Sequence, residues 1–531
     1  MHRARADHCD PPPRSAGVRR GVVVVLAVAL AAGACADDGA PGGSDTATES
    51  IPADATTVAP VSTTAPTPTT TVAPPRGAAV AVPTVAGPVT GGDRGGLPAN
   101  PAPRAVLEEY GYVEEEFFIS GEATGYAPVG ELGTDGRWEV TAADTSPFTT
   151  RILVRRPADP AAADGVVGVE WLNVSGGQDA DPDFGFLYPE FMARGTTWVG
   201  VSAQFSGVDG PGLGIPIPGV TATPIKAADP TRYAPIDHPG DDFSYDIFSQ
   251  AAQAIRRPDG VDPLGGVTPG HVIALGESQS AGRLTTYVNA IHPQADIFDG
   301  FLVHSRFGGA PLSADAAAPA VVNFRTDLTD PILWFQTETD VARAFAARQP
   351  DTDLIVTWEV AGAAHADISQ LEWGGASNRE VEPDRETPDF TALCGPINQG
   401  PQPVVLRRAW SDLVAWVVEG TIPASAPPLE IVDGRIARDD LGIAIGGIRT
   451  PDVDVPRAVH SGESRPDASI ICSLFGSTTP LDAEVLATRY PTHEDYVTRV
   501  RESAQAAADA GFLLPEGVEE LVAAADAASV P

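Results

Sequence analysis

A serine flanked by small residues is the first feature of the sequence that suggests chemistry. Residues 276–280 read Gly-Glu-Ser-Gln-Ser with Ser278 in the middle, after an apolar run over 271–275 and before a helical pattern that starts near Ala281. A strand, a sharp turn and a helix in this order expose the central hydroxyl as a nucleophile, and the turn needs small residues on both sides. Ser280 stands where the common pattern has glycine, but it is also small. Ser278 is therefore the predicted nucleophile, and a tight turn with a capping serine is the alternative.

A serine hydroxyl becomes reactive only when a base removes its proton, and the base needs an acid that fixes its orientation. The expected chain order is serine, acid, histidine. A strand predicted over 332–335 runs into a short acidic loop, in which Asp340 is the candidate acid and Glu338 is the alternative. His365 follows the predicted strand 354–360 in a loop of small residues and is the candidate base.

Three other polar residues near these candidates have plainer interpretations. His304 follows a strand but precedes the acid in the chain, which breaks the expected order. Asp367 comes shortly after the candidate base and is expected to be a neighbour or a helix cap rather than the acid. Glu170 lies within a predicted strand and is expected to be a paired structural carboxylate.

An anion that develops on a substrate carbonyl needs backbone N–H donors. Gln279, the residue after the nucleophile, is one expected donor, and the loop after the third central strand is expected to supply another. That loop reads Asn-Val-Ser-Gly-Gly over 173–177, and Ser175 and Gly176 are its candidate donors. Its glycines allow the backbone to approach a ligand, and a plain glycine turn is the alternative.

The elements that would position these residues follow from the apolar pattern. Strands are predicted at 112–120, 148–155, 166–173, 197–202, 271–275, 299–303, 332–335 and 354–360, and helices at 184–194, 244–255 and 281–291. Apolar strands that alternate with helices favour an α/β fold, with a mostly parallel sheet covered on both faces. A Gly/Pro-rich segment over 204–241 is expected to be a lid or pocket wall. Its glycines do not open a helix after a strand, so a dinucleotide fingerprint is not supported. The chemistry of a serine, a base and an acid needs no cofactor, and none is expected.

The first hundred residues differ from the rest. Residues 1–35 combine arginines, a short apolar run and small residues before Cys35, which resembles a signal peptide that ends in a lipidated cysteine. Residues 36–100 are rich in Thr, Pro and Ala, which favours a disordered spacer, and the globular composition runs over 101–531. We therefore expect an extracytoplasmic protein held at the cell membrane by a lipid anchor, or a secreted one if cleavage falls near Ala34.

Charge and cysteine spacing exclude several classes of partner. The chain has 34 Lys and Arg against 71 Asp and Glu, a net charge of −37, which repels phosphate backbones, so no nucleic acid partner is expected. None of the four cysteines has CxxC spacing, so neither a zinc site nor another metal site is predicted.

Several stretches resemble bacterial proteins known as alpha/beta hydrolase domain-containing proteins. The matching stretches are 169–174, 276–284, 336–340, 361–367, 394–398 and 471–481. The resemblance covers about residue 101 to the C-terminus, so the C-terminal extension is expected to be integral to one unit. It implies an α/β-hydrolase fold and assigns Ser278, His365 and either Asp340 or Glu338 to the catalytic triad.

Cys394 and Cys472 are the two cysteines of the globular part. An oxidising compartment and an even count favour a disulfide between them. The resulting hypothesis is an exported serine hydrolase that cleaves small-molecule carboxylic esters through an acyl-enzyme. The alternatives are acyl transfer or amide cleavage with the same triad, or a non-catalytic binding lipoprotein on a hydrolase scaffold.

Overall fold

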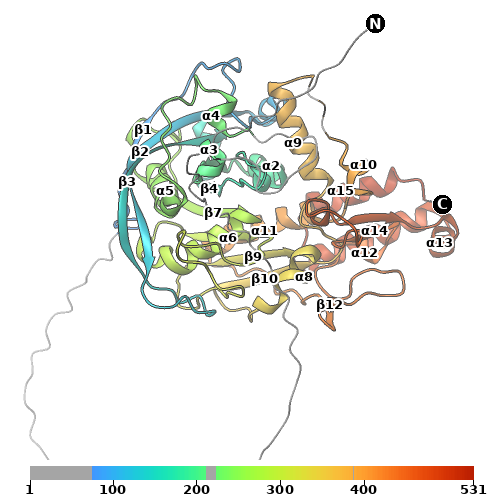
Figure 1. Ribbon diagram of the computed structural model, residues 1–531. Coiled ribbons are helices and arrows are strands. Elements are labelled where there is room, and N and C mark those ends of the chain that lie inside the picture. The colour runs from blue at the N-terminus through green and yellow to red at the C-terminus, as the bar shows by residue number, and fades with distance from the viewer. Residues whose placement is uncertain (1–74, 211–222, 385, 387, 531) are drawn as a thin grey trace, which may run out of the picture. The chain divides into compact units, whose positions relative to one another are not determined.

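The computed structural model describes residues 75–210, 223–384, 386 and 388–530 (Figure 1). The predicted signal peptide, Cys35 and most of the predicted spacer lie outside these residues. In the described part, no helix combines the length and the apolar character needed to cross a membrane.

A ten-stranded sheet forms the centre of the described chain, in the order β10-β9-β8-β7-β4-β5-β3-β2-β1-β6. The strands β10, β9, β8, β7, β4 and β5 run parallel, whereas β3, β2 and β1 join the sheet by antiparallel pairing. Their bounds are β1 Thr84–Ala86, β2 Tyr112–Pro128, β3 Val140–Pro157, β4 Val166–Trp171, β5 Thr197–Val201, β6 Asp259–Gly260, β7 His271–Glu277, β8 Gly300–His304, β9 Ile332–Thr337 and β10 Ile355–Val360. The predicted mostly parallel sheet is confirmed for the part that carries the candidate site residues.

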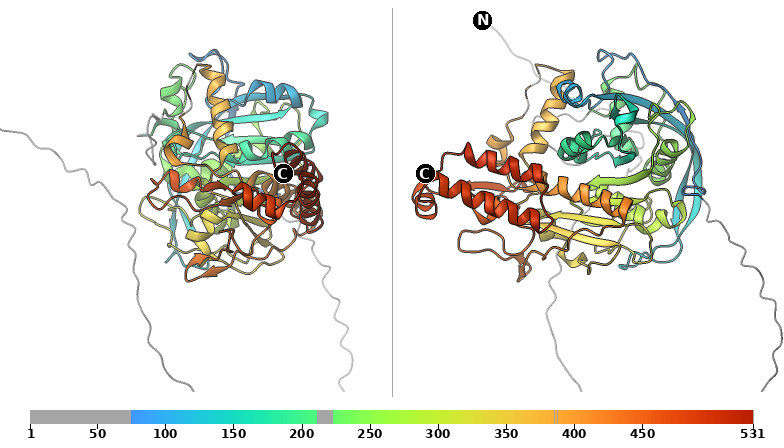
Figure 2. Two further views of the ribbon diagram at one scale, coloured as in Figure 1. Left: turned by 90° about the vertical axis from the view of Figure 1, so that its right-hand side faces the viewer. Right: turned by 180° about the vertical axis from the view of Figure 1, so that it is seen from behind.

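Helices cover both faces of this sheet, and two short hairpins follow it (Figures 1 and 2). The helices are α1 Arg104–Tyr110, α2 Pro182–Arg194, α3 Phe205–Asp209, α4 Ile225–Ala228, α5 Ser244–Arg256, α6 Gln279–Thr286, α7 His292–Ala295, α8 Glu338–Ala344, α9 Ile368–Val381, α10 Phe390–Cys394, α11 Gln402–Glu419, α12 Pro451–Asp454, α13 Ala483–Arg489, α14 His493–Asp509 and α15 Pro515–Asp526. The hairpin strands are β11 Ile431–Val432 with β12 Arg435–Ile436, and β13 Ala458–Ser461 with β14 Ser477–Pro480.

Strand β7 shows why the central strands read as continuous apolar runs. Val272 and Ala274 belong to the buried cluster that includes residues of α5 and α6, whereas Ile273 and Leu275 belong to the cluster that includes residues of α2 and α11. Because successive side chains of a strand point to opposite faces, a strand that is covered on both sides needs apolar residues at every position.

The predicted spacer ends earlier than expected. Residues 75–100 belong to the described part, and β1 within them pairs antiparallel with β2. Val85 of β1 is 2% exposed and packs in the same cluster as α5. The spacer prediction over 36–100 is therefore corrected at its end, because scattered valines in this Pro- and Gly-rich stretch suffice for burial when a sheet edge is available.

The predicted lid segment is only partly described, since residues 211–222 lie outside the described part. Its flanks are not irregular throughout, because they form α3 and α4. Val208, Ile225 and Tyr233 share one buried cluster, and Phe118 of β2 packs against it, so these flanks contact the central sheet.

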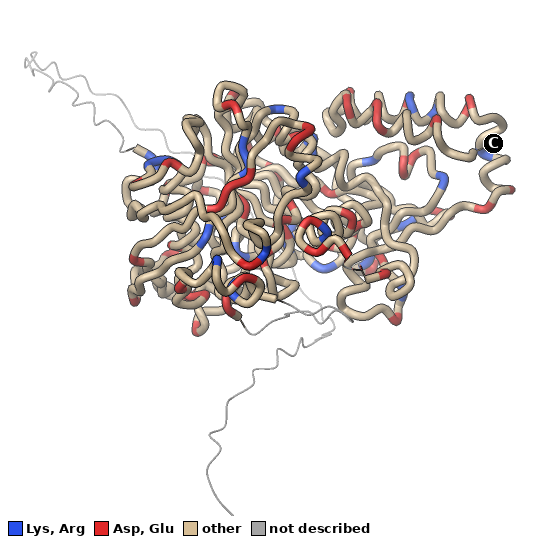
Figure 3. The backbone as a smooth tube through the Cα atoms, turned by 90° about the horizontal axis from the view of Figure 1, so that it is seen from above, with Lys and Arg blue, Asp and Glu red and all other residues tan. Residues whose placement is uncertain are grey.

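The C-terminal extension packs on the body as expected. Leu513 belongs to the same buried cluster as α11 and β10, and Phe512 contacts Trp358 of β10 with ring centroids 5.3 Å apart. The predicted disulfide between Cys394 and Cys472 is present and closes a separation of 78 residues. Acidic positions are spread along most of the described backbone, including these last helices (Figure 3).

Candidate active site

The turn between β7 and α6 holds Ser278 in a strained conformation. Its φ is 60° and its ψ is −114°, which a residue with a side chain rarely adopts. The turn is held by Ser278 N, which donates to the carbonyl of His304 at 2.9 Å. A Cβ on Gly276 would lie 3.2 Å from the backbone of Ser280, which explains the glycine. Ser280 is accommodated in place of the usual glycine because its hydroxyl donates back to the carbonyl of Glu277 at 2.8 Å.

The structure brings Ser278, His365 and Asp340 together. Ser278 Oγ lies 2.7 Å from His365 Nε2, and His365 Nδ1 lies 2.6 Å from Asp340 Oδ1. The three residues follow β7, β10 and β9, which are parallel, so they meet at the carboxyl edge of the sheet. With Nδ1–H donated to Asp340, Nε2 is free to accept the Ser278 hydroxyl proton.

Asp340 is ionised in this arrangement. Burial alone would raise its pKa, but the contact with His365 and the hydrogen bonds from Thr337 outweigh burial and hold the pKa below its ordinary value. Thr337 N and Oγ1 donate to Asp340 Oδ2 at 2.8 and 2.6 Å. The same bonds form a capping box at the start of α8, so helix initiation and the orientation of the acid share one set of contacts.

Glu338, the alternative acid, serves another purpose. Its carboxylate accepts hydrogen bonds from the backbone N–H of Gly362 at 2.6 Å and of Gly462 at 2.9 Å, and Arg438 Nη2 lies 2.9 Å away. Glu338 thus connects the loop that carries His365 to the C-terminal extension and makes no hydrogen bond with the imidazole.

The loop after β4 approaches the turn from the other side. Asn173 Nδ2 donates to the Glu277 carbonyl at 3.0 Å, and Asn173 Oδ1 accepts the Ser175 N–H at 2.8 Å. Ser175, a predicted oxyanion donor, is therefore already engaged, which corrects that assignment. The preceding amide, Val174 N–H, donates only a long hydrogen bond of 3.5 Å, to Gln279 Oε1, so it is less firmly engaged than the amide of Ser175.

The other predicted donors lie in different surroundings. Gly176 lies further along the same loop, and no heavy atom lies within 4 Å of the position where its Cβ would be. Gln279 begins α6, so its N–H is one of the free donors of a helix N-terminus directly after Ser278.

Sequence reasoning missed two residues near the imidazole: Phe307 stacks on it, and Arg343 lies over the Phe307 ring. The Phe307 ring lies 4.7 Å from the His365 ring at an interplanar angle of 19°. The guanidinium carbon of Arg343 lies 4.9 Å from the centre of the Phe307 ring, and its Nη2 donates to Ser473 Oγ at 2.9 Å.

Glu277 is a further carboxyl group at the site. It is 2% exposed, and its Oε1 lies 3.4 Å from His365 Nε2. Burial raises the pKa of Glu277 well above its ordinary value, and the charges of Asp183 and Asp340 add to this effect. Glu277 was predicted only as part of the motif, because no sequence pattern shows which way its side chain points.

The remaining polar candidates have structural roles. Glu170 accepts the N–H groups of Asp183 and Phe184 at the start of α2, at 3.1 and 3.0 Å, instead of forming the expected ion pair. Asp367 accepts from Ser369 N at 2.8 Å and caps α9, and burial raises its pKa to about 7. His304 Nδ1 pairs with Asp183 at 2.8 Å.

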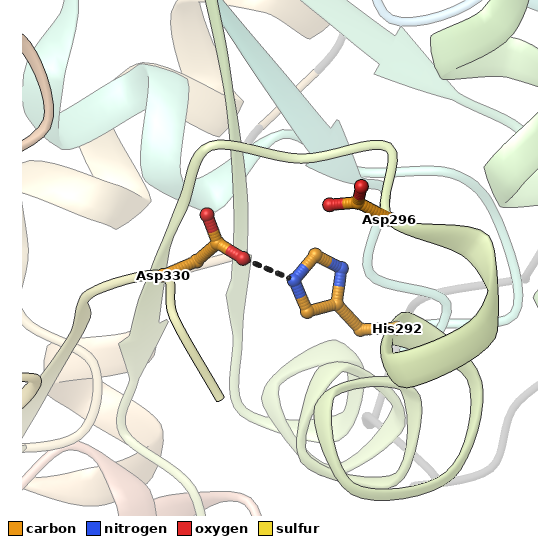
Figure 4. Close-up of side chains that lie close together, drawn as sticks. All are labelled: His292, Asp296 and Asp330. Atoms are coloured by element: carbon orange, nitrogen blue, oxygen red, sulfur yellow. Dashed lines mark hydrogen bonds and ion pairs between the residues drawn. The ribbon is translucent and has the colours of Figure 1, made fainter. Parts of the chain in front are cut away.

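A second titratable cluster lies at the opposite end of the strands (Figure 4). His292 Nε2 lies 2.9 Å from Asp330 Oδ2, and Asp296 is close by. Arg76 contacts Asp330 and Asp296, the latter at 2.7 Å, and Asp299 at 2.8 Å. These carboxylates therefore neutralise a guanidinium that fixes the start of the described chain, and the cluster is remote from Ser278.

Comparisons with known proteins match this chain to solved structures and to one protein family. The solved structures include an alpha-beta serine hydrolase homologue from Coxiella burnetii (12% identity, 48% of this chain and 96% of that chain, TM-score 0.26). They also include an α/β serine hydrolase without lid from Xanthomonas campestris (12% identity, 49% and 94%, TM-score 0.25) and an esterase from Rhizomucor miehei (12% identity, 50% and 83%, TM-score 0.23). No curated protein gives a significant match. Residues 85–523 match the family described as "Alpha/beta hydrolase domain", and the chain belongs to this family.

Proposed function

We propose that this protein is a serine hydrolase that cleaves carboxylic esters, with Ser278 as nucleophile, His365 as general base and Asp340 as the acid that orients the base. The observation that carries the proposal is the continuous hydrogen-bond chain from Ser278 Oγ through His365 to Asp340, at 2.7 and 2.6 Å. Its members follow three parallel strands in the chain order that this fold uses.

The geometry supports a two-step reaction. Ser278 Oγ attacks the ester carbonyl while its proton moves to His365 Nε2, and the N–H groups of Gln279 and Val174 stabilise the resulting oxyanion. The intermediate collapses when the C–O bond to the alcohol breaks and Nε2 gives its proton to the alcohol oxygen. A water molecule then attacks the acyl-enzyme, again with His365 as base, and releases the acid and free Ser278.

Labelling with a fluorophosphonate tests this proposal. We expect one adduct, on the peptide that contains Ser278, in folded protein and none in Ser278→Ala or in heat-denatured protein. An unlabelled Ser278 in folded protein contradicts the proposal. Hydrolysis of p-nitrophenyl esters of graded chain length, lost in Ser278→Ala, then defines the acyl preference.

Acyl transfer and amide cleavage use the same residues, and product analysis separates them. Competing alcohol acceptors divert the acyl group in a transferase, whereas a hydrolase releases mainly the free acid. A purely binding role would be favoured if Ser278 and His365 lay out of hydrogen-bond reach, and their 2.7 Å separation argues against it.

We also propose that the protein works outside the cytoplasm, tethered through a lipid on Cys35. The disulfide between Cys394 and Cys472 supports an oxidising compartment. Metabolic labelling with a fatty acid tests the tether: we expect label in the wild type and none in Cys35→Ala. A wild-type protein that is released without label supports simple secretion instead.

A further inference from the structure

The imidazole of His365 lies between two carboxyl groups. Asp340 contacts Nδ1 at 2.6 Å, and Glu277 Oε1 lies 3.4 Å from Nε2, the nitrogen that also contacts Ser278 Oγ at 2.7 Å. Glu277 is the last residue of β7 and directly precedes Ser278, so its position is fixed by the same turn. The Asp340 contact is explained by the proposed triad, but the Glu277 contact is not.

The groups that face Glu277 disfavour its negative charge. Asn173 Nδ2, from the loop after β4, donates to Oε2 at 3.2 Å. Asp183 of α2 and Asp340 of α8 add negative charge, and no Lys or Arg of the described residues forms an ion pair with it. Together with burial, these groups hold the pKa of Glu277 high.

The hydrogen bond between Ser278 and His365 in the resting site also disfavours a negative charge on Glu277. When Ser278 donates to His365 Nε2, that nitrogen carries a lone pair. An ionised carboxylate with Oε1 at 3.4 Å would set a negative charge against that lone pair, whereas a protonated carboxyl group would not. The surroundings of Glu277 therefore favour its protonated form in the resting site.

We propose that Glu277 is a positioning residue for the serine attack: it is protonated in the resting site, and once ionised it stabilises the His365 cation across the 3.4 Å contact and accelerates acylation. This inference rests on the proposed function. In the attack, the Ser278 O–H bond breaks, the proton moves to Nε2 and the new C–O bond places negative charge on the carbonyl oxygen. Glu277 exchanges no proton in this step and contributes only its charge.

The distances from Glu277 to the His365 cation and to the oxyanion decide whether its negative charge accelerates or slows acylation. The cation forms 3.4 Å from Glu277 Oε1, whereas the oxyanion forms beyond Ser278, beside the N–H of Gln279. Because Coulomb energy falls with distance and is large in a buried site, attraction to the cation exceeds repulsion of the oxyanion. The closer approach of Ser278 Oγ to Nε2 keeps the proton available for the leaving alcohol, since Glu277 lies farther away.

The test is the rate of Ser278 labelling by a fluorophosphonate between pH 5 and 10. In the wild type we expect the labelling rate to rise about tenfold over the pH range in which Glu277 ionises. Glu277→Gln keeps the shape and neutrality of the protonated side chain but cannot ionise, so its profile should lack this rise. Glu170→Gln is the matched control, because it removes another buried glutamate that does not contact His365, and it should keep the wild-type profile.

Three results overturn the inference: a wild-type profile without this rise, a Glu277→Gln profile that retains it, or a folded Glu277→Gln that reacts at no pH. Thermal melting establishes whether Glu277→Gln is folded. If it is not, the wild-type profile and the profile of Glu277→Asp are compared instead. The shorter aspartate withdraws the carboxylate from Nε2, so a smaller rise supports the inference and an unchanged one overturns it. Absence of labelling in the wild type at every pH counts against the proposed function itself.

Discussion

Glu338 and Asp340 lie in the first turn of α8, yet their carboxylates face different partners. Asp340 contacts Nδ1 of His365, whereas Glu338 contacts Arg438 and the amides of Gly362 and Gly462. One short acidic segment therefore provides both an orienting acid for the candidate base and an anchor for the loop that carries it.

Substitution separates these two roles. We expect Asp340→Asn to lower kcat by about three orders of magnitude or more with an intact fold, because the amide no longer holds the imidazole in the required tautomer. Glu338→Gln should retain most of kcat but lose about 1–3 kcal/mol in the free energy of unfolding, because Arg438 and two amides lose a charged acceptor. Ester hydrolysis and urea unfolding of both variants check this. The reverse pattern, with Glu338→Gln inactive and Asp340→Asn active, contradicts the assignment.

Glu170 predicts a pH dependence of stability. Burial and the charges of Asp183 and Asp181 raise its pKa well above 4.5 in the folded protein. The folded state then retains a proton that the unfolded state releases, so this group's contribution to stability falls as pH rises from about 4.5 towards the folded pKa. In Glu170→Gln the free energy of unfolding should fall less steeply over that window, by up to about 1 kcal/mol per pH unit. Urea unfolding at pH 5 and pH 8 measures the difference, and parallel slopes would falsify the prediction.

The parallel half of the sheet could be predicted from the sequence because helices bury both of its faces. Strands β4, β5 and β7 to β10 are covered on both faces, so they read as continuous apolar runs, and the expected strands coincide with them to within a few residues. The lengths of β2 and β3 were underestimated, because the main missed segments, 121–128 and 140–147, carry Gly, Pro and small or polar residues instead of an apolar pattern. Burial of β1 was missed, since it depends on a partner strand that local composition does not show.

The residues of the candidate site likewise fall into those that could be predicted from the sequence and those that could not. Ser278, Asp340 and His365 could be proposed because each occupies a defined place after a strand, and parallel strands bring such places together. Glu277 and Phe307 could not, because their contacts with His365 depend on side-chain directions at a turn and in a loop. The engagement of the Ser175 amide depends on the Asn173 side chain, which a motif does not specify.

The disulfide is expected to stabilise the segment next to the candidate base. Cys472 begins a short 3₁₀ turn, and the carbonyl of Leu474 within it accepts the N–H of Ala366 at 3.1 Å. Replacing both Cys394 and Cys472 by serine should lower the free energy of unfolding by about 2–4 kcal/mol, because the 78-residue separation is no longer closed. Urea unfolding measures the loss, with Ser473→Ala as a neighbouring control that keeps the disulfide. Equal stability of the double variant and the wild type contradicts this role.

The stack of Phe307 on His365 makes a prediction about rate rather than stability. The flat ring at 4.7 Å limits rotation of the imidazole, which must present Nε2 to Ser278 and Nδ1 to Asp340 together. Phe307→Leu keeps apolar volume but removes the flat face, so we expect kcat to fall about tenfold while KM changes little. Phe512→Leu is the control, because its ring packs on Trp358 and should affect stability alone. Steady-state kinetics and thermal melting of both variants distinguish the two effects. A Phe307→Leu enzyme with wild-type kcat shows that Asp340 and the backbone suffice to hold the imidazole.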